Sequence, residues 1–185
     1  YADYIVADEV VDGNEVVDGN KIYYTASSKV TPSQYSGDFG VNIISNEFDA
    51  STGECVITFD GNLTKIADRA FYSCKSLANV VIPDGVTSIG NYAFYYCDAL
   101  ANVVIPEGVT SIGAYAFYGC PSLTDIYCKP TTPPSGDNDM FEVIDSGCKI
   151  YVPKIAVQAY KNANGWSNYA DYIVADEVVD GNEVV

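Results

Sequence analysis

The stretch 79–120, NVVIPDGVTSIGNYAFYYCDALANVVIPEGVTSIGAYAFYGC, contains nearly the same sequence twice. Asn79–Cys97 and Asn102–Cys120 match at most positions, at a spacing of 23 residues. A fixed period of this size is typical of solenoid proteins. Each unit is too short to bury its own apolar side, so neighbouring units stack into one continuous core. The stretch therefore predicts a solenoid fold, and it does not by itself indicate a catalytic or ligand-binding site.

Apolar residues recur in columns when the chain is aligned at this period. The columns are Leu63/Val86/Val109, Ile66/Ile89/Ile112, Phe71/Phe94/Phe117, Cys74/Cys97/Cys120, Leu77/Leu100/Leu123, Val80/Val103/Ile126 and Ile82/Ile105/Cys128. Within a unit, the pattern L-x-x-V-x-I predicts a strand whose alternate residues point inward. A second short extended piece, VTSIG, follows it, and segment 91–97 predicts a helical turn that returns the chain to the next strand.

The repeat and its flanks also resemble a known family. Residues 70–97, AFYSCKSLANVVIPDGVTSIGNYAFYYC, are similar to the BspA-like leucine-rich repeats of bacterial surface proteins. The segments 20–32 and 40–66 resemble the family's N-terminal β cap, and 149–173 resembles its C-terminal cap, a strand followed by a helix. The resemblance covers about residues 19–174. It implies an exported protein at the cell surface or secreted, in a family with several members discussed as adhesins.

We therefore expect a β-rich α/β solenoid, a right-handed stack of leucine-rich repeats with period 23. Its expected divisions are an acidic linker or tail of a preceding module (1–20), an N-terminal β cap (21–59), the repeats (60–128), a loop with a C-terminal cap (129–168) and a second copy of the linker (169–185). In the C-terminal cap, Ile155, Ala156, Ala159 and Tyr160 have the spacing of one helix face. Trp166, the only tryptophan, is expected to seal the last layer.

A second repetition lies at the two ends of the chain. Residues 1–17 and 169–185 are identical, YADYIVADEVVDGNEVV. The simplest interpretation is a parent chain of tandem modules of about 168 residues, with neighbouring copies as partners; an artificial duplication is the alternative. Tandem modules predict that both copies share one conformation, or that both are extended and packed little. Asp-Gly between β-branched runs fits a small meander, and a flexible acidic linker fits equally.

Composition limits the partners and the chemistry. The net charge of −16, concentrated at the two ends, argues against binding to nucleic acid or anionic membranes. No apolar run reaches the ~18 residues of a membrane-spanning helix. The six cysteines include no C-x-x-C pair and the chain has no histidine, so neither a structural zinc site nor any cofactor is expected. We expect these thiols to be reduced and buried.

Catalysis has little support in the sequence. The lack of histidine excludes Ser-His and Cys-His pairs, and no glycine-rich phosphate loop is present. A carboxylate pair for glycoside hydrolysis remains open, although nothing singles one out. Asp-Gly-Asn at 12–14, 18–20 and 180–182 hints at calcium, but turn chemistry explains these residues. We therefore expect a protein that is not an enzyme.

Two aligned stripes are candidate binding surfaces. The first projects from the strand face and consists of Asn79, Val81, Asn102, Val104, Asp125 and Tyr127. The second is Tyr72, Tyr95 and Tyr118. Each has a structural alternative, a ladder of asparagine hydrogen bonds for the first and rung-to-rung packing for the second. We favour the strand face as the site of a non-enzymatic module that binds a protein or glycan in adhesion or in a host or matrix interaction. A structural spacer in a tandem surface array is the alternative.

Overall fold

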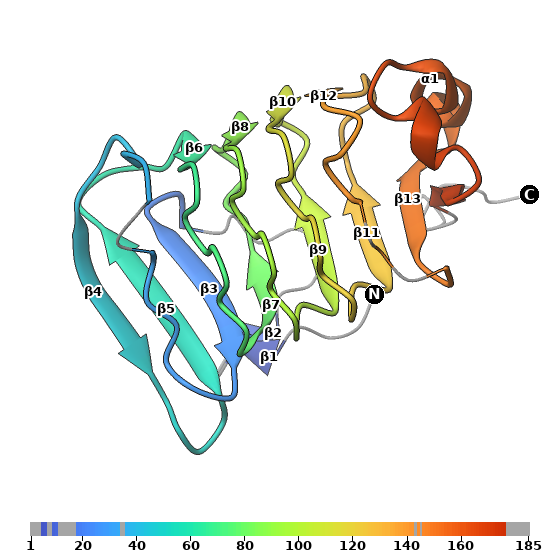
Figure 1. Cartoon of the computed structure of the whole chain (residues 1–185). Coiled ribbons are helices and arrows are strands. Elements are labelled where there is room, and N and C mark those ends of the chain that lie inside the picture. Colours follow the sequence, from blue (N-terminus) through green and yellow to red (C-terminus); the bar gives the residue numbers. More distant parts are fainter. Residues whose placement is uncertain are drawn as a thin grey trace, which may run out of the picture.

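The computed structural model describes residues 5–6, 9–10, 18–33, 36–142, 144 and 146–176. Among them are an eight-stranded sheet of order β14-β13-β11-β9-β7-β3-β5-β4, a four-stranded sheet of order β12-β10-β8-β6 and a pair, β1-β2 (Figure 1). The strands are β1 (Ile5–Val6), β2 (Glu9–Val10), β3 (Lys21–Ala26), β4 (Ile43–Phe48), β5 (Glu54–Phe59), β6 (Lys65–Ile66), β7 (Leu77–Val81), β8 (Ser88–Ile89), β9 (Asn102–Ile105), β10 (Ser111–Ile112), β11 (Asp125–Cys128), β12 (Ser135–Gly136), β13 (Lys149–Pro153) and β14 (Ile173–Asp176).

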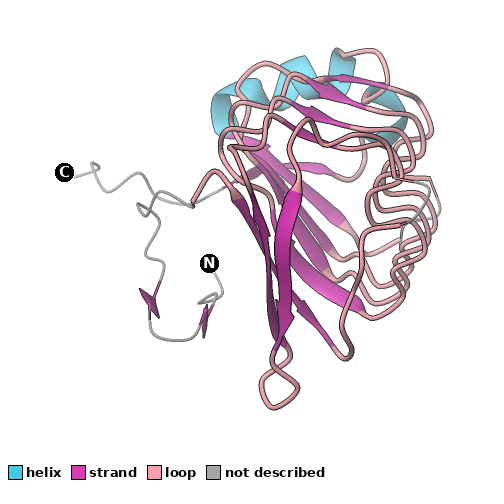
Figure 2. Ribbon diagram, turned by 90° about the vertical axis from the view of Figure 1, so that its left-hand side faces the viewer, coloured by secondary structure: helices cyan, strands magenta, loops and turns pink. Residues whose placement is uncertain are grey.

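Corresponding residues of successive repeats pair in two parallel arrays. In the large sheet Asn79 pairs with Asn102, and Asn102 pairs with Asp125. In the small sheet Lys65 pairs with Ser88, and Ser88 pairs with Ser111. Each repeat thus supplies one strand to each array. The strands of the large sheet gather on one side of the molecule and the turns stack on the opposite side (Figure 2).

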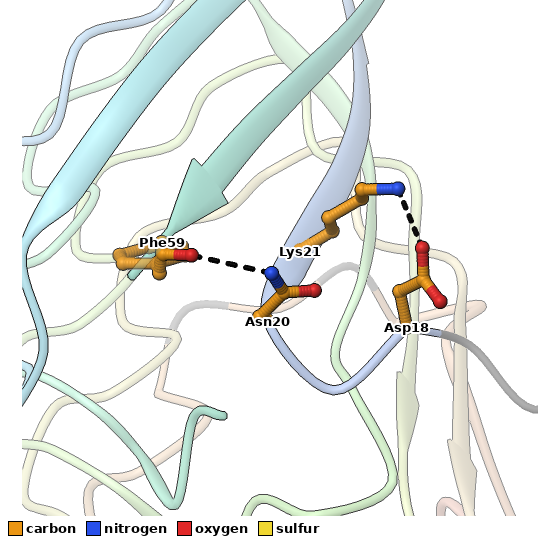
Figure 3. Close-up of polar contacts among 4 residues, drawn as sticks. All are labelled: Asp18, Asn20, Lys21 and Phe59. Carbon is orange, nitrogen blue, oxygen red and sulfur yellow. Dashed lines mark hydrogen bonds and ion pairs between the residues drawn. The ribbon is translucent and has the colours of Figure 1, made fainter. Parts of the chain in front are cut away.

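An antiparallel group extends the large sheet at the N-terminal end. β3 pairs antiparallel with β7 on one side and with β5 on the other, and β4 follows β5. A turn at 18–20 leads into β3, and in it the Lys21 N–H donates to the Asp18 carbonyl at 3.0 Å. Two side-chain contacts hold the turn: Lys21 Nζ donates to the Asp18 carboxylate, and Asn20 Nδ2 donates to the Phe59 carbonyl at 3.2 Å (Figure 3). Turn chemistry therefore accounts for this Asp-Gly-Asn. The copies at 12–14 and 180–182 lie outside the described residues.

A column of stacked aromatic rings runs through the core. Phe71, Phe94 and Phe117 are fully buried, with ring centroids 5.2 and 5.1 Å apart and nearly parallel planes. This confirms that the phenylalanine column points inward. Phe141 continues the stack at 5.4 Å from Phe117, although the sequence alignment at period 23 did not include it.

The predicted helical turn over 91–97 is wrong. The chain forms hydrogen-bonded turns there, and alternate N–H groups donate to the next repeat: Phe94 to the Ala116 carbonyl at 2.7 Å and Tyr96 to the Tyr118 carbonyl at 2.9 Å. Tyr96 has φ 54° and Tyr92 has φ 57°. A left-handed conformation costs a non-glycine residue roughly 1–2 kcal/mol. The inter-repeat hydrogen bonds offset that cost, whereas a helix would turn these donors back into their own repeat.

The cysteines are free thiols, as predicted, and five of the six are buried. Cys97 Sγ donates to the Phe71 carbonyl at 3.1 Å, and Cys120 Sγ donates to the Phe94 carbonyl at 3.2 Å. Burial raises the pKa of Cys120 to about 12. Cys74 is only half-buried, because it starts the column and faces the loop at Thr31 rather than another repeat.

The helix predicted near the C-terminal end is present, but it buries fewer of the predicted residues than expected. A 3-10 turn, η1 (Lys154–Ala156), precedes α1 (Val157–Asn162), and a second, η2 (Ser167–Tyr169), follows. Ala156 and Tyr160 are buried, but Ala159 is exposed and Ile155 is 85% exposed, so the predicted four-residue face is wrong for these two. The tighter 3-10 turn rotates Ile155 away from the core. Trp166 is fully buried against Tyr160 and Phe141.

The sheet continues past the division expected at residue 168. Tyr169 and Ile173 are buried, and Ile173–Asp176 forms β14 at the edge of the large sheet. The expectation that both copies of the repeated end segment pack little is therefore wrong for this part of the second copy. The described pairings of the two copies also differ, since Ile5–Val6 pairs antiparallel with β2 whereas Ile173–Val174 pairs parallel with β13.

Candidate binding surfaces of the repeat

The outer face of the large sheet has an apolar row one residue wide. Strand register aligns, in order across the sheet, Val56, Tyr23, Val81, Val104, Tyr127, Tyr151 and Val174. Every member is half-buried. The predicted positions Val81, Val104 and Tyr127 are thus brought together, and the row runs beyond the repeats in both directions.

A polar row lies beside the apolar one. Asn79 Nδ2 donates to Thr25 Oγ1 at 2.8 Å, and Asn102 Nδ2 donates to Asn79 Oδ1 at 2.8 Å. Asp125 follows Asn102 in register and accepts a hydrogen bond from Thr124 Oγ1 at 2.7 Å. The asparagine ladder is therefore present: these amides stabilise the stack while remaining half-exposed.

Aromatic rings cover the C-terminal part of this face. Tyr127 and Tyr151 stack with centroids 4.7 Å apart and an interplanar angle of 11°. Burial, and then the neighbouring Asp125 carboxylate, raise the pKa of Tyr151. Tyr151 was missed because the unit ending in β13 departs from the period. The alternation in KIYVP, with Ile150 and Val152 buried on either side of Tyr151, was the available signal.

The tyrosine stripe belongs to the turns, on the other side of the molecule. Tyr95 stacks between Tyr72 and Tyr118, each at 5.1 Å. A second column, missed from the sequence, lies beside it: Tyr92 stacks on Tyr115 at 5.2 Å. The recurrence of Arg69, Tyr92 and Tyr115 at the repeat period was the available signal.

The central ring of this stripe, and the Tyr92 ring beside it, already have both faces occupied. Tyr95 has a tyrosine on each face of its ring, and Tyr92 lies between Tyr115 and the Arg69 guanidinium, 5.1 Å from its centroid. Sugar rings and guanidinium groups bind tyrosine through the ring face. The stripe therefore offers a partner mainly ring edges and hydroxyl groups, and its rung-to-rung packing agrees with the structural interpretation.

The described part of the chain offers little support for a metal site, a membrane-spanning helix or a small-molecule pocket. No group of three or more His, Cys, Asp or Glu side chains there could hold a metal ion, and no helix there is long and apolar enough to cross a membrane. A hollow of about 220 Å³ near β6 is lined by Asp38, Lys65 and Asp68 among others. This is below the ~300–1,000 Å³ usual for small-molecule sites.

Comparisons with known proteins identify the repeat as a leucine-rich repeat. No curated protein sequence matches the chain significantly. A leucine-rich repeat protein from Bacteroides ovatus, known from a crystal structure, is similar over 60% of this chain and 28% of its own length, with 22% sequence identity and a TM-score of 0.40. The chain thus spans just over a quarter of that protein. Residues 41–163 match the model of the BspA type leucine rich repeat region in six copies, and the chain therefore belongs to this family.

Proposed function

We propose that this chain is a non-enzymatic module, secreted or at the cell surface, that binds a protein or glycan partner through the outer face of its large sheet. The observation that carries the proposal is the apolar row alongside the polar ladder. Val81, Val104 and Tyr127 are spaced one strand apart, about 4.8 Å. Such a row offers a long surface on which an extended partner makes the same contact at each strand.

The proposed architecture is a right-handed solenoid of period 23 with covered ends. The antiparallel group β3–β5 would form the cover at one end. Trp166, whose Nε1 donates to the Pro134 carbonyl at 2.7 Å, would form it at the other with α1. Solenoid ends need such covers because they would otherwise expose an apolar layer. With the ends covered, the side faces remain for binding.

Charge supports the choice of partner. The net charge of −16 favours neutral or basic partners over nucleic acid and anionic membranes. A contribution from charge would make the binding weaken as ionic strength rises. The surface location rests on the family, whose members are typically found there.

The test is a screen of glycans and matrix proteins, followed by two matched double variants. Asn102→Arg with Val104→Glu places new charges on the strand face; Tyr95→Arg with Tyr118→Glu places the same charges on the turns. Circular dichroism verifies that both variants fold. Binding lost only in the first supports the proposal, and binding lost only in the second moves the site to the tyrosine stripe.

A structural spacer is the second candidate function. The identical segments 1–17 and 169–185 favour it, because they fit a chain built of repeated modules. A screen without any reproducible partner would support the spacer over the binding module.

A further inference from the structure

One sequence has two different strand pairings in this chain. Residues 1–17 and 169–185 are identical. In the first copy, Ile5 pairs with Val10 in the antiparallel β1-β2 pair. In the second copy, Ile173 pairs with Ile150 in the large sheet. The chain therefore contains two copies of a strand that fits the edge of β13, and a single such edge among the described residues.

The contacts that hold the second copy depend on residues that the first copy also has. Ile173 is 2% exposed, and the Ile150 N–H donates to the Tyr172 carbonyl at 2.9 Å. The Tyr169 hydroxyl donates to the Asn138 carbonyl and accepts from the Phe141 N–H at 3.2 Å. Tyr169, Tyr172 and Ile173 correspond to Tyr1, Tyr4 and Ile5. A segment with the first copy's sequence can make the same contacts on β13.

We propose that the β13 edge is an exchangeable docking site, and that its second occupant is the N-terminal segment of another copy of this chain. The segment would add to β13 as a parallel strand in place of β14, with Ile5 in the position of Ile173. This is strand addition, in which main-chain hydrogen bonds give affinity and buried side chains give specificity.

Chain order points to another copy rather than the same chain. The first copy runs through the turn at 18–20 into β3, where the Leu63 N–H donates to the Gly19 carbonyl at 2.7 Å and fixes its exit. β3 is separated from β13 by β7, β9 and β11 in the large sheet, a distance of about 19 Å. Returning to its own β13 would draw the segment across the strand face. On another copy, the same connection runs from the edge strand of one module into β3 of the next.

The result is a head-to-tail contact, which can propagate because the two partners use different surfaces. In the intact chain, β14 is tethered and competes at an effective concentration on the order of millimolar. Exchange at micromolar protein concentration therefore requires that β14 is weakened. This competition makes the proposal testable by single substitutions at corresponding positions.

The experiment uses full-length variants in sedimentation velocity at about 5–200 µM. Ile173→Asp disables β14 and leaves the first copy intact, so its mass is expected to rise with concentration from 19.9 kDa to at least twice that value. Ile5→Asp is the matched control and should remain monomeric. The double variant, Ile5→Asp with Ile173→Asp, should also remain monomeric, because neither copy can then dock.

A peptide of residues 1–17 keeps the test decisive if the substituted chains fold poorly. Added to the double variant, it should raise Tm, since it binds only the folded form. The same peptide with Ile5→Asp should not. A monomeric Ile173→Asp chain, or a peptide without effect, overturns the proposal. A monomer whose Tm falls when Ile5→Asp is added also overturns it, because the segment would then fill the edge of its own chain.

Discussion

Substitution of Phe94 tests whether the stacked ring column stabilises this protein. Phe94 is fully buried between Phe71 and Phe117, at 5.2 and 5.1 Å. Phe94→Leu keeps most of the buried apolar surface and loses both aromatic pairs, at about 0.5–1.5 kcal/mol each, so the free energy of unfolding should fall by about 1–3 kcal/mol. Phe94→Ala also leaves a cavity and should cost about 3–5 kcal/mol.

Equilibrium unfolding in urea, followed by the fluorescence of the buried Trp166, measures these differences. For a chain of this length, Phe94→Ala should lower Tm by roughly 6–20 °C, at about 2–4 °C per kcal/mol. The control is Tyr72→Leu, which removes one stacked pair at a ring that is 37% exposed. If Phe94→Leu costs no more than Tyr72→Leu at an unchanged denaturant slope, the column is not a principal source of stability.

Three further predictions concern the thiols and the turns. Thiol titration near pH 8 should find few reactive groups in the native protein and all six after denaturation, with half-buried Cys74 reacting first. Because burial raises the pKa of Cys120 from 9.0 to about 12, its contribution to stability is full below pH 9 and is lost as pH rises toward 12. Cys120→Ala should therefore lessen the decline in unfolding free energy between roughly pH 9 and 10 by about 1 kcal/mol, and equal declines would contradict this. Gly119→Ala should cost more than 1 kcal/mol, because φ is 68° and the new Cβ would lie 2.3 Å from the Tyr96 ring. Tyr96→Ala should recover part of that loss, and an undiminished loss in the double variant would leave backbone conformation as the sole cause.

The core could be predicted from the sequence because the same positions of each repeat face inward. The burial of Phe71, Phe94 and Phe117 followed from their recurrence alone. The asparagine ladder was the structural alternative for the polar row, and it follows on the same basis, since parallel pairing brings Asn79 and Asn102 side by side.

The remaining features depend on contacts that no local pattern reports. The left-handed φ of Tyr96 is unusual for tyrosine and is stabilised by the repeat beside it. Ile155 has the spacing of a buried helical residue, but the 3-10 turn exposes it. Ile5 and Ile173 are the clearest case: their neighbours in sequence are identical, so only their surroundings in space can give them different partners.

The direction of the inter-repeat hydrogen bonds has a mechanical consequence. Both the strands and the turns bond to the next repeat, as in Asn79 with Asn102 and Phe94 with Ala116. A force that pulls the two ends of the stack apart therefore acts along these bonds at every repeat boundary. Repeats should peel off in sequence at low force, each releasing 23 residues, or about 76–83 Å of extended chain. Under tension, the stack would behave as an extensible tether rather than as a rigid rod.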